Sequence, residues 1–582
     1  MKLNKINAWV FVWGFLVYLL LTRFQYHFFY IEQNQLFLNV NSYGIAKLAQ
    51  VGGLSGFLSE FLVQFFIYPY AGPLIVATLL TGVGMATQGV LRLIAPKSPF
   101  FIAPILPMLA LLFVHFDFYY RIQGTISYLM MLLFMYGYMN ISRPSYRLIV
   151  GALLAPLLFG IGGSVALLFA LLVTLYEILK KTPQWYLAWI GLAEVCLLGI
   201  LSNHAGWLGA YRFSLTPELY YHHKLHPQGV IYFAWIILPI LFLIVTFWKK
   251  NEKEEKSKLE FVLIILQVTL VLFLLNRGIA IYGDSKNAKL KELDYYSRTE
   301  QWDKTIQACQ GNLTNYLYVC HLNMALANRG ELADKMFHYN QMGVEGLIVP
   351  WNKQEHVSCL LSDVYFTMGA IASSQEMAFE AFVSAMGDGN PRMLKRLVQT
   401  NLIFGDYPVA EKYISTLEKT SGYEEWATSQ RQYLYNDEAI KNDSILGTRR
   451  VMLPKKNTLT VLEELTDELD HLLENGSGNK ATLQYLGAIY LLTKNLDGFK
   501  ALVEKYYGTK VLPILPVHFQ EAIIVMSEKN AEYWKRFNLS DAIVSRFEEY
   551  KKQVLANRNH SGVAGLLNRA YGNTYWFYYM FK

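Results

Sequence analysis

A series of apolar segments fills the first half of the chain and limits what this sequence can fold into. The segments lie at about 7–27, 71–92, 99–116, 124–140, 147–161, 163–179, 184–202, 229–248 and 260–278. About 20 predominantly apolar residues cross a bilayer as a helix. The 582 residues are 53% hydrophobic and 17% charged, with mean hydropathy +0.22, which is too apolar for an ordinary soluble protein. We therefore predict an all-α chain with a polytopic membrane domain of about nine spans over 1–280.

The segments 147–161 and 163–179 leave the span count open. Each is short, and only Gly160-Ile161-Gly162-Gly163 separates them, which is typical of either two spans or a tight re-entrant hairpin. Nine spans put residues 281–582 on the side of the bilayer opposite the N-terminus. Eight spans put both on the same side.

Positive charges in the short connections predict the orientation. Cytoplasmic connections of membrane proteins carry the excess of Lys and Arg. With the N-terminus inside, thirteen such residues fall on the cytoplasmic side: Lys2, Lys5, Arg92, Lys97, Arg143, Arg147, Lys180, Lys181, Lys249, Lys250, Lys253, Lys256 and Lys258. Six fall on the other side: Arg23, Lys47, Arg121, Arg212, Lys224 and Arg277. We predict a cytoplasmic N-terminus and an extracytoplasmic domain over 281–582.

The charge balance differs between the two halves. Residues 1–280 hold 19 Lys and Arg against 10 Asp and Glu, whereas 281–582 hold 33 against 35. Nucleic-acid binding needs a concentrated basic surface, and the second half has no net positive charge. The composition therefore excludes nucleic acid as a predicted partner, and the bilayer accounts for the basic excess.

The predicted extracytoplasmic loops contain the charged and histidine residues that are candidates for a functional site. The first, about 25–70, contains Glu32 and two short stretches, 42–50 and 54–68, separated by Gly52-Gly53. A run as short as 54–68, which contains Glu60, is more typical of a juxtamembrane or re-entrant helix than of a span. The later loops contain Asp117 and Arg121, and then Arg212, His222, His223 and Lys224.

These residues predict a site for an anionic donor at the membrane face. Glu32 is the candidate general base, and the alternative is an ordinary interfacial charge. Phosphates are the expected ligands of Arg121, Arg212, His222, His223 and Lys224. Secondary candidates are Glu60, Asp117 and Glu194, the last of which lies in mid-span and is either functional or a neutral carboxyl bonded to another helix. Adjacent His222 and His223 are poorly spaced for one metal, so no metal site and no cofactor is predicted, and a divalent metal is unsupported.

From about Leu290 the sequence changes to short amphipathic helices joined by turns. Three turns, at Gly330, Gly369 and Gly405, are 39 and 36 residues apart, close to the 34 of a tetratricopeptide helix pair. The pattern predicts a tetratricopeptide-like repeat domain; the alternative is an irregular helical bundle. If Tyr407 packs in the core of the repeat, Tyr407→Ala should destabilise it by a few kcal/mol. Solenoids of this kind bind partners and seldom catalyse. Among Cys309, Cys320 and Cys359, either the first two pair or all are free buried thiols.

Two resemblances add to this interpretation. The acid at Glu32 after the first span, the two stretches within 42–68 and the soluble C-terminal domain resemble the layout of GT-C glycosyltransferases that use polyprenyl-phosphate sugars. Neither Asp-x-Asp nor Trp-Trp-Asp is present. The stretches 30–37 and 325–339 resemble a domain-of-unknown-function family of multipass proteins from Gram-negative anaerobes with a tetratricopeptide-like tail. That resemblance implies a bacterial inner-membrane location and no particular activity.

The resulting hypotheses belong to different function classes. The first is a GT-C-like transferase with a polyprenyl-phosphate-linked donor at the outer face of the inner membrane. The alternative is a non-catalytic, membrane-anchored scaffold for envelope assembly, whose helical repeat binds a protein or glycan partner. A transporter is third, because only Glu194 is charged in mid-span.

Overall fold

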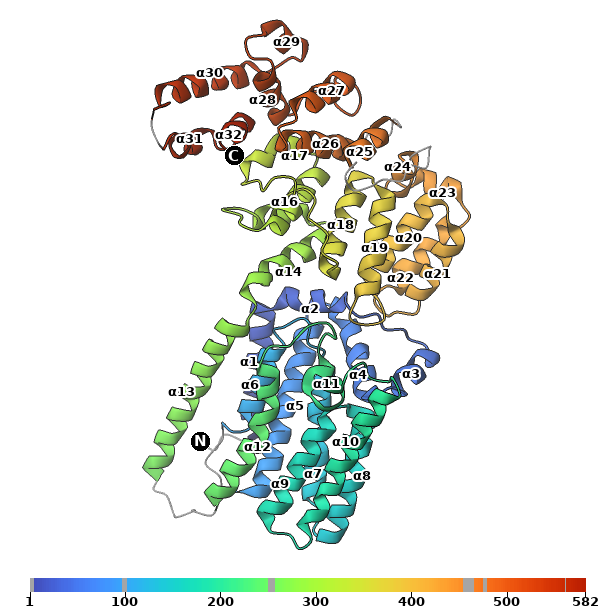
Figure 1. Ribbon diagram of the computed structural model, residues 1–582, viewed down its shortest axis with the longest axis vertical. Helices are drawn as coiled ribbons and strands as arrows, with labels where there is room; N and C mark the ends of the chain where they lie inside the picture. The colour runs from blue at the N-terminus through green and yellow to red at the C-terminus, as the bar shows by residue number, and fades with distance from the viewer. Residues whose placement is uncertain (1–4, 97–101, 250–256, 454–464, 475–478, 560–561) are drawn as a thin grey trace. The chain divides into compact units, whose positions relative to one another are not determined.

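The computed structural model describes residues 5–96, 102–249, 257–453, 465–474, 479–559 and 562–582 (Figure 1). Across these ranges the regular structure is helical, and the β contacts are three isolated bridges, which confirms the all-α class. The chain forms two compact units. The first comprises Met1–Ala288, Met386–Asp388 and Lys419–Gly422; the second comprises Lys289–Ala385, Gly389–Glu418 and Tyr423–Lys582.

The first unit contains the long apolar helices. Its elements are α1 (Lys5–Arg23), α2 (Gln25–Glu32), α3 (Asn41–Leu48), α4 (Gly53–Val63), η1 (Gln64–Ile67), α5 (Ala71–Ile94), α6 (Ile105–Val114), α7 (Gln123–Met139), α8 (Pro144–Gly162), α9 (Val165–Lys180), η2 (Trp185–Ala188), α10 (Trp189–His204), α11 (Tyr211–Leu215), η3 (Pro217–Tyr220), α12 (Val230–Lys249) and α13 (Ser257–Tyr282). Each predicted apolar segment overlaps one or two of these helices, and residues 99–101 of the predicted segment 99–116 lie outside the described residues.

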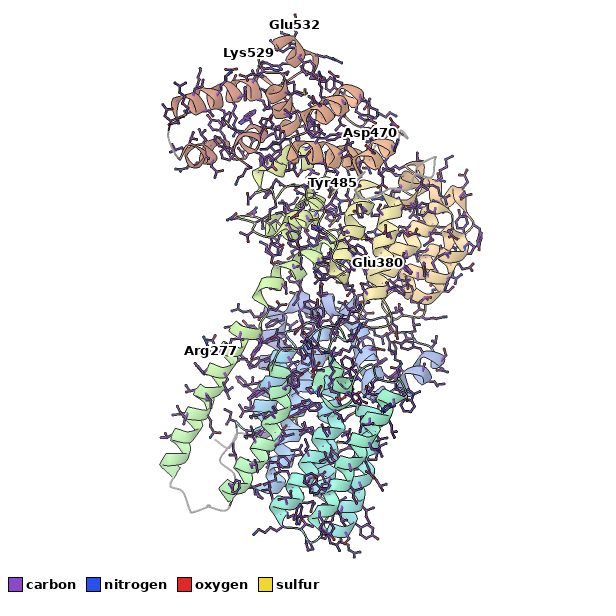
Figure 2. The ribbon with its side chains drawn as sticks, in the orientation of Figure 1. Arg277, Glu380, Asp470, Tyr485, Lys529 and Glu532 are labelled. Atoms are coloured by element: carbon purple, nitrogen blue, oxygen red, sulfur yellow. The ribbon has the colours of Figure 1, made fainter. Side chains whose placement is uncertain are left out.

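Five helices in the described ranges are long and apolar enough to cross a membrane: α5, α8, the η2–α10 pair, α12 and α13. A sixth is added if α1 and α2, which meet at a bend of 79°, form one broken span. The helices α6, α7 and α9 have only 10, 17 and 16 residues. Arg277 of α13, labelled in Figure 2, is exposed.

The glycine-rich segment between α8 and α9 forms a tight helical hairpin. Gly163 has φ +84°, a conformation that residues with a side chain rarely adopt, and it ends α8. The hydroxyl of Tyr220 donates to the carbonyl of Gly162 (2.6 Å) and accepts from the backbone N–H of Val165 (3.0 Å). Both ends of the helix break are therefore hydrogen-bonded, as buried irregular backbone requires.

An ion pair inside the first unit ties α8 to α9. Arg147 Nε lies 2.6 Å from Glu177 Oε1, and Arg147 Nη2 lies 2.9 Å from Glu177 Oε2. The two side chains are 1% and 0% exposed. The hydroxyl of Tyr138 donates a further bond of 2.7 Å to Glu177. Arg147, which is one of the predicted cytoplasmic positive charges, is buried.

The second unit is built of shorter helices. Its elements are α14 (Ser285–Arg298), in which the division between the units falls, α15 (Trp302–Ala308), α16 (Tyr316–Asn328), α17 (Leu332–Lys335), η4 (Met336–His338), α18 (Glu355–Met368), α19 (Ile371–Ser384), α20 (Pro391–Phe404), α21 (Tyr407–Leu417), α22 (Glu424–Gln430), η5 (Arg431–Tyr433), α23 (Asp437–Asn442), α24 (Leu446–Val451), α25 (Leu465–Glu474), α26 (Lys480–Leu492), α27 (Leu496–Tyr506), α28 (Val517–Met526), α29 (Ala531–Arg536), α30 (Asp541–Ala556), α31 (Val563–Tyr571) and α32 (Tyr575–Phe581).

Consecutive helices of this unit pack as pairs around glycine turns. Gly369 and Gly405 end α18 and α20 in the left-handed conformation, with φ +88° and +81°, and Gly330 follows α16 with φ +72°. The pairs α18–α19 and α20–α21 pack together. Tyr485 of α26 is fully buried in the core (Figure 2). Tyr407 is only half-buried and bonds Asp437 and Arg450, so the condition of core packing is not met.

All four cysteines are free thiols. Cys309 and Cys320 are buried, and their thiols lie 3.7 and 3.3 Å from the carbonyls of Tyr318 and Leu347. The alternative in which these two cysteines form a disulfide was therefore wrong. Burial raises the pKa of both thiols to about 12, so they remain protonated and poorly reactive.

Candidate functional site

A cavity of about 460 Å³ lies among the connecting segments of the first unit. Its walls come from α3, α4 and the turn between them, from the residues at the start of α7, from the loop that follows α10 and from η3. The lining residues are Lys47, Ala49, Gln50, Val51, Gly52, Gly53, Gly56, Glu60, Arg121, Gln123, Trp207, Leu208 and Leu219. Two cations, one carboxylate and two amides thus face the same space as an indole and two leucines. This mixture suits a ligand with a charged group and an apolar part.

Glycines allow the backbone to form one wall of this cavity. Gly52 has φ +70° and precedes α4. A Cβ at Gly52 would lie 3.3 Å from the backbone of Gly163, and a Cβ at Gly53 would lie 2.5 Å from the carbonyl oxygen of Leu48. The side chain of Gln123 donates to the carbonyl of Gly52 (3.2 Å) and so fixes this turn against α7. A larger residue at either glycine would displace the wall.

The cavity carboxylate, Glu60, is held by two donors. Lys47 Nζ lies 2.8 Å from Glu60 Oε1, and the Tyr43 hydroxyl donates to Glu60 Oε2 at 2.7 Å. The same ammonium lies 2.9 Å from Asp388 Oδ2. Burial, and then the neighbouring Glu60 charge, raises the pKa of Tyr43, so the phenol stays protonated. Lys47 therefore bridges two carboxylates, and one of them lines the cavity.

The second cation, Arg121, is held mainly through its backbone. Its N–H donates to the carbonyl of Tyr220 (2.9 Å), beside the isolated bridge between Tyr120 and Tyr221. Its guanidinium donates to the carbonyl of Met386 (2.6 Å). Burial lowers the pKa of Arg121, and the carboxylates of Glu60 and Asp388 partly oppose that shift. A guanidinium has five donors, so this contact leaves capacity for an anion in the cavity.

Comparison with known proteins places the chain in a family. The model of DUF6057, a family of unknown function, matches residues 2–582. The chain belongs to this family. No curated protein and no solved structure matches it. The predicted membership of an uncharacterised family is thus confirmed. The comparisons name no activity, so the geometry of the site is the basis for its chemistry.

The structure brings together only two of the predicted site residues in the cavity, Arg121 and Glu60. The predicted base, Glu32, is the last residue of α2; it is 2% exposed and is not among the lining residues. A bend of 79° separates α2 from α1, and the residues from His27 to Glu32 are buried. Glu60, a secondary candidate, is therefore the carboxylate with access to the cavity.

The predicted cations of the later loop form a separate cluster outside the cavity lining. Arg212 donates to the carbonyl of His223 (2.8 Å) and lies 3.4 Å from Glu218. The rings of His222 and His223 stack at 4.8 Å, and Lys224 is exposed. Burial, and then the charges of His223, Arg121 and Lys224, lowers the pKa of His222 to about 4, and burial lowers that of His223 as well. Both imidazoles are neutral near pH 7 and supply no positive charge for phosphate.

The remaining secondary candidates occupy other environments. Asp117 accepts from the Tyr221 hydroxyl (2.5 Å) and from the backbone of Tyr119 (3.0 Å), so it stabilises the loop. Glu194 lies on α10, outside the cavity lining, and its Oε2 is buried without a hydrogen-bond partner in the described residues. Among those same residues, no three His, Cys, Asp or Glu side chains gather in a way that would hold a metal.

Three residues at the cavity were not predicted from the sequence: Lys47 and Gln123, which line it, and Asp388, which pairs with Lys47. The sequence predicts Lys47 only as one of the positive charges on the side opposite the N-terminus. A signal for it existed, because Lys47 and Glu60 flank the Gly52-Gly53 turn, and two helices joined by a tight turn bring their flanking residues together. No sequence signal connects Asp388 with residues more than 300 positions earlier.

Proposed function

We propose that this DUF6057 protein is a GT-C-like transferase that uses a polyprenyl-phosphate-linked donor at the extracytoplasmic face of the bacterial inner membrane. The observation that carries the proposal is the cavity in which Lys47 and Arg121 lie with Glu60. Lys and Arg side chains bind phosphate oxygens through charge-assisted hydrogen bonds. The apolar side of the cavity, formed by Trp207, Leu208 and Leu219, suits the first part of a lipid chain.

The proposal assigns a step to each charged residue. Lys47 and Arg121 bind the donor phosphate, and an acceptor hydroxyl enters beside Glu60. The acceptor oxygen forms a bond to the transferred carbon, and the bond between that carbon and the phosphate oxygen breaks. Polyprenyl phosphate leaves with the bonding electron pair, and Glu60 takes the acceptor proton. Because Lys47 already contacts Glu60, a bound phosphate competes for this ammonium and frees the carboxylate to act as a base.

Binding of a polyprenyl monophosphate to the purified full chain in detergent micelles tests the phosphate site. We expect Lys47→Gln and Arg121→Gln each to weaken binding roughly 10-fold or more, because each removes a charge-assisted bond worth about 1.5–3 kcal/mol. Arg212→Gln and Lys224→Gln, which change cations outside the cavity lining, are matched controls and should stay within about 2-fold. The free polyprenyl alcohol should bind more weakly than the phosphate. Equal binding of alcohol and phosphate, or equal losses in all four variants, would contradict the proposal.

The proposed topology has nine spans, with α1 and α2 as a broken first span and the shorter α6, α7 and α9 included. It puts the N-terminus in the cytoplasm and the second unit outside. A periplasm-active reporter should therefore be active when fused after Lys286 and inactive when fused after Lys256. The reverse pattern would put the second unit in the cytoplasm and remove the proposed access of the cavity to an extracytoplasmic donor.

A non-catalytic scaffold is the second candidate, favoured by the apolar face of α19 in the second unit. Phe379 and Val383, one helical turn apart, are 49% and 56% exposed. In this alternative the tetratricopeptide-like helix pairs bind an envelope protein or glycan, and the cavity has no ligand. Loss of a cellular phenotype in Phe379→Ser, with full retention in Glu60→Gln, would favour the scaffold.

A further inference from the structure

The second unit contains a cavity of its own, of about 170 Å³, that is unusually rich in cations. It is lined by residues of α14, α15, α16, α18, α20 and α24. Five of them are basic: Arg298, Arg392, Lys395, Arg396 and Arg449. Two lining residues, Glu300 and Asp363, are acidic. Like charges this close repel each other at partly buried positions, so the arrangement needs balancing negative charge.

The carboxylates balance only part of this charge. Arg392 lies between Asp294 (2.7 Å) and Asp363 (2.5 Å), and Arg396 shares Asp363 at 2.9 Å. Lys395 and Arg449 form no ion pair with any residue that the structure describes. These two cations are therefore the ones for which a ligand can supply the counter-charge.

Aromatic stacking holds the cations at the cavity. The guanidinium carbons of Arg396 and Arg449 lie 3.6 and 4.1 Å from the centroid of the Phe366 ring. Two groups this close to one ring can only stack on its opposite faces. Lys395 lies 4.5 Å from the centroid of Trp426. The positive groups are thus fixed in place by cation–π contacts, which orient them without neutralising them.

A hydrogen-bond donor at the cavity also lacks an acceptor. The Nε of Arg396 is buried, and no atom of the described residues accepts its hydrogen. An unpaired buried donor of a charged group costs free energy. An oxyanion beside Arg396 would supply the acceptor and the charge together.

The lowered pKa values of two basic side chains also favour an anion in the cavity. Burial, followed by the charges of Arg298 and Arg396, lowers the pKa of Lys395 to about 8. Burial, followed by the charge of Arg396, lowers the pKa of Arg449 to about 10. Cations whose protonated forms are disfavoured in this way gain most from a nearby anion, which restores their ordinary pKa values.

We propose that this cavity binds a phosphoryl group, either as inorganic phosphate or as the phosphate of a monoester, with Lys395, Arg396 and Arg449 as ligands. Arginine guanidinium groups match the geometry of phosphate oxygens, and a dianion balances the two cations without carboxylate partners. A water molecule occupies about 30 Å³ in the liquid, so 170 Å³ holds one phosphoryl group with a few waters. This inference stands on the second unit alone and does not depend on the proposed transferase.

Calorimetric titration of the full chain in detergent tests the site, with inorganic phosphate and glycerol 3-phosphate as separate probes. Tighter binding of the ester would indicate a phosphorylated ligand, and tighter binding of the free ion would indicate phosphate itself; either supports the site. We expect Lys395→Gln and Arg449→Gln each to weaken binding roughly 10-fold or more. Arg431→Gln, which removes an exposed cation paired with Glu418, is the control and should stay within about 2-fold.

A pH series separates ligand binding from a purely structural role of Lys395. Sulfate, whose charge is constant in this range, serves as the probe. Its affinity should fall as the pH rises from about 7 to 9, because Lys395, which faces Arg298, Arg392, Arg396 and Glu300, loses its proton. Lys395→Gln should remove this dependence. Absence of any binding at millimolar phosphate, or losses in the control equal to those in the two cavity variants, would overturn the proposal.

Discussion

Replacing Arg147 by methionine should destabilise the first unit by about 3–5 kcal/mol, because it leaves the Glu177 carboxylate buried without its counter-ion. Two nitrogens of Arg147 bond the two oxygens of Glu177, and neither side chain is accessible to solvent. Methionine fills a similar volume, so the expected loss comes from the unpaired charge and not from a void. The pair joins α8 to α9 on the far side of the hairpin from Tyr220, so its loss should loosen both helices.

A second variant separates the cost of an unpaired charge from the contribution of the pair itself. The double variant Arg147→Met/Glu177→Gln removes both charges, and the glutamine still accepts the hydrogen bond of Tyr138. It should recover most of the stability. The measurement is the temperature at which half of the detergent-solubilised chain is lost from the monodisperse peak of a size-exclusion column. Arg143→Met, an exposed neighbour, is the control. A double variant as unstable as Arg147→Met would show that the arginine contributes by packing instead.

The Arg147–Glu177 pair shows why positive charges in the sequence do not always predict topology. Arg147 counts as a cytoplasmic positive charge in the sequence because it follows a connection, and nothing local distinguishes it from the exposed Arg143. Its partner Glu177 lies 30 residues later, at the end of another apolar segment. Sequence periodicity shows that a segment is apolar, but it does not show which polar residues of two segments meet. Pairing across helices is decided by packing, which depends on the whole unit.

The glycine turns of the second unit could be predicted from the sequence better than the residues of the cavity could. Gly369 and Gly405 were expected at the ends of helices, and both adopt a left-handed conformation there, because this local requirement is visible in a few consecutive residues. The segment that follows α1, about 25–70, was less predictable. Its two short stretches are helical, but the carboxylate that reaches the cavity is Glu60 and not Glu32. A bend of 79° follows Arg23 and sets the direction of α2, and no glycine or proline near Phe24 predicts that bend.

Replacing Glu355 by glutamine should stabilise the second unit at pH 8 and leave it nearly unchanged at pH 5. Burial raises the pKa of Glu355 from its ordinary 4.5 to about 8, with the nearby charge of Asp294 adding to the shift. The folded chain therefore favours the protonated carboxyl. Its contribution to stability is complete below pH 4.5 and is lost as the pH rises toward 8, because the unfolded chain releases this proton earlier.

The expected gain is about 2–3 kcal/mol near pH 8. The full shift of pKa would correspond to roughly 4–5 kcal/mol. Glu355 is the first residue of α18, and a helix N-terminus favours the ionised form by up to about 1 kcal/mol. Partial solvent access reduces the figure further. Glutamine keeps an oxygen that can accept from Asn390 Nδ2, which lies 2.6 Å from Glu355 Oε1, so the contact that also orients the cap of α20 is preserved.

Cys359 gives a local measurement of this effect. Its thiol is free, buried and 3.5 Å from Asn390 Nδ2, so it reacts with a thiol reagent only when this region opens. Labelling of Cys359, followed by mass spectrometry of its peptide, should become slower at pH 8 in Glu355→Gln than in the parent chain once both rates are divided by that of an unstructured thiol peptide at the same pH. At pH 5 the two corrected rates should agree. Glu425→Gln, an exposed carboxyl on α22, should change neither rate. A Glu355→Gln variant that opens as readily as the parent at both pH values would show that Glu355 is ionised in the folded chain, with its charge balanced by Arg392.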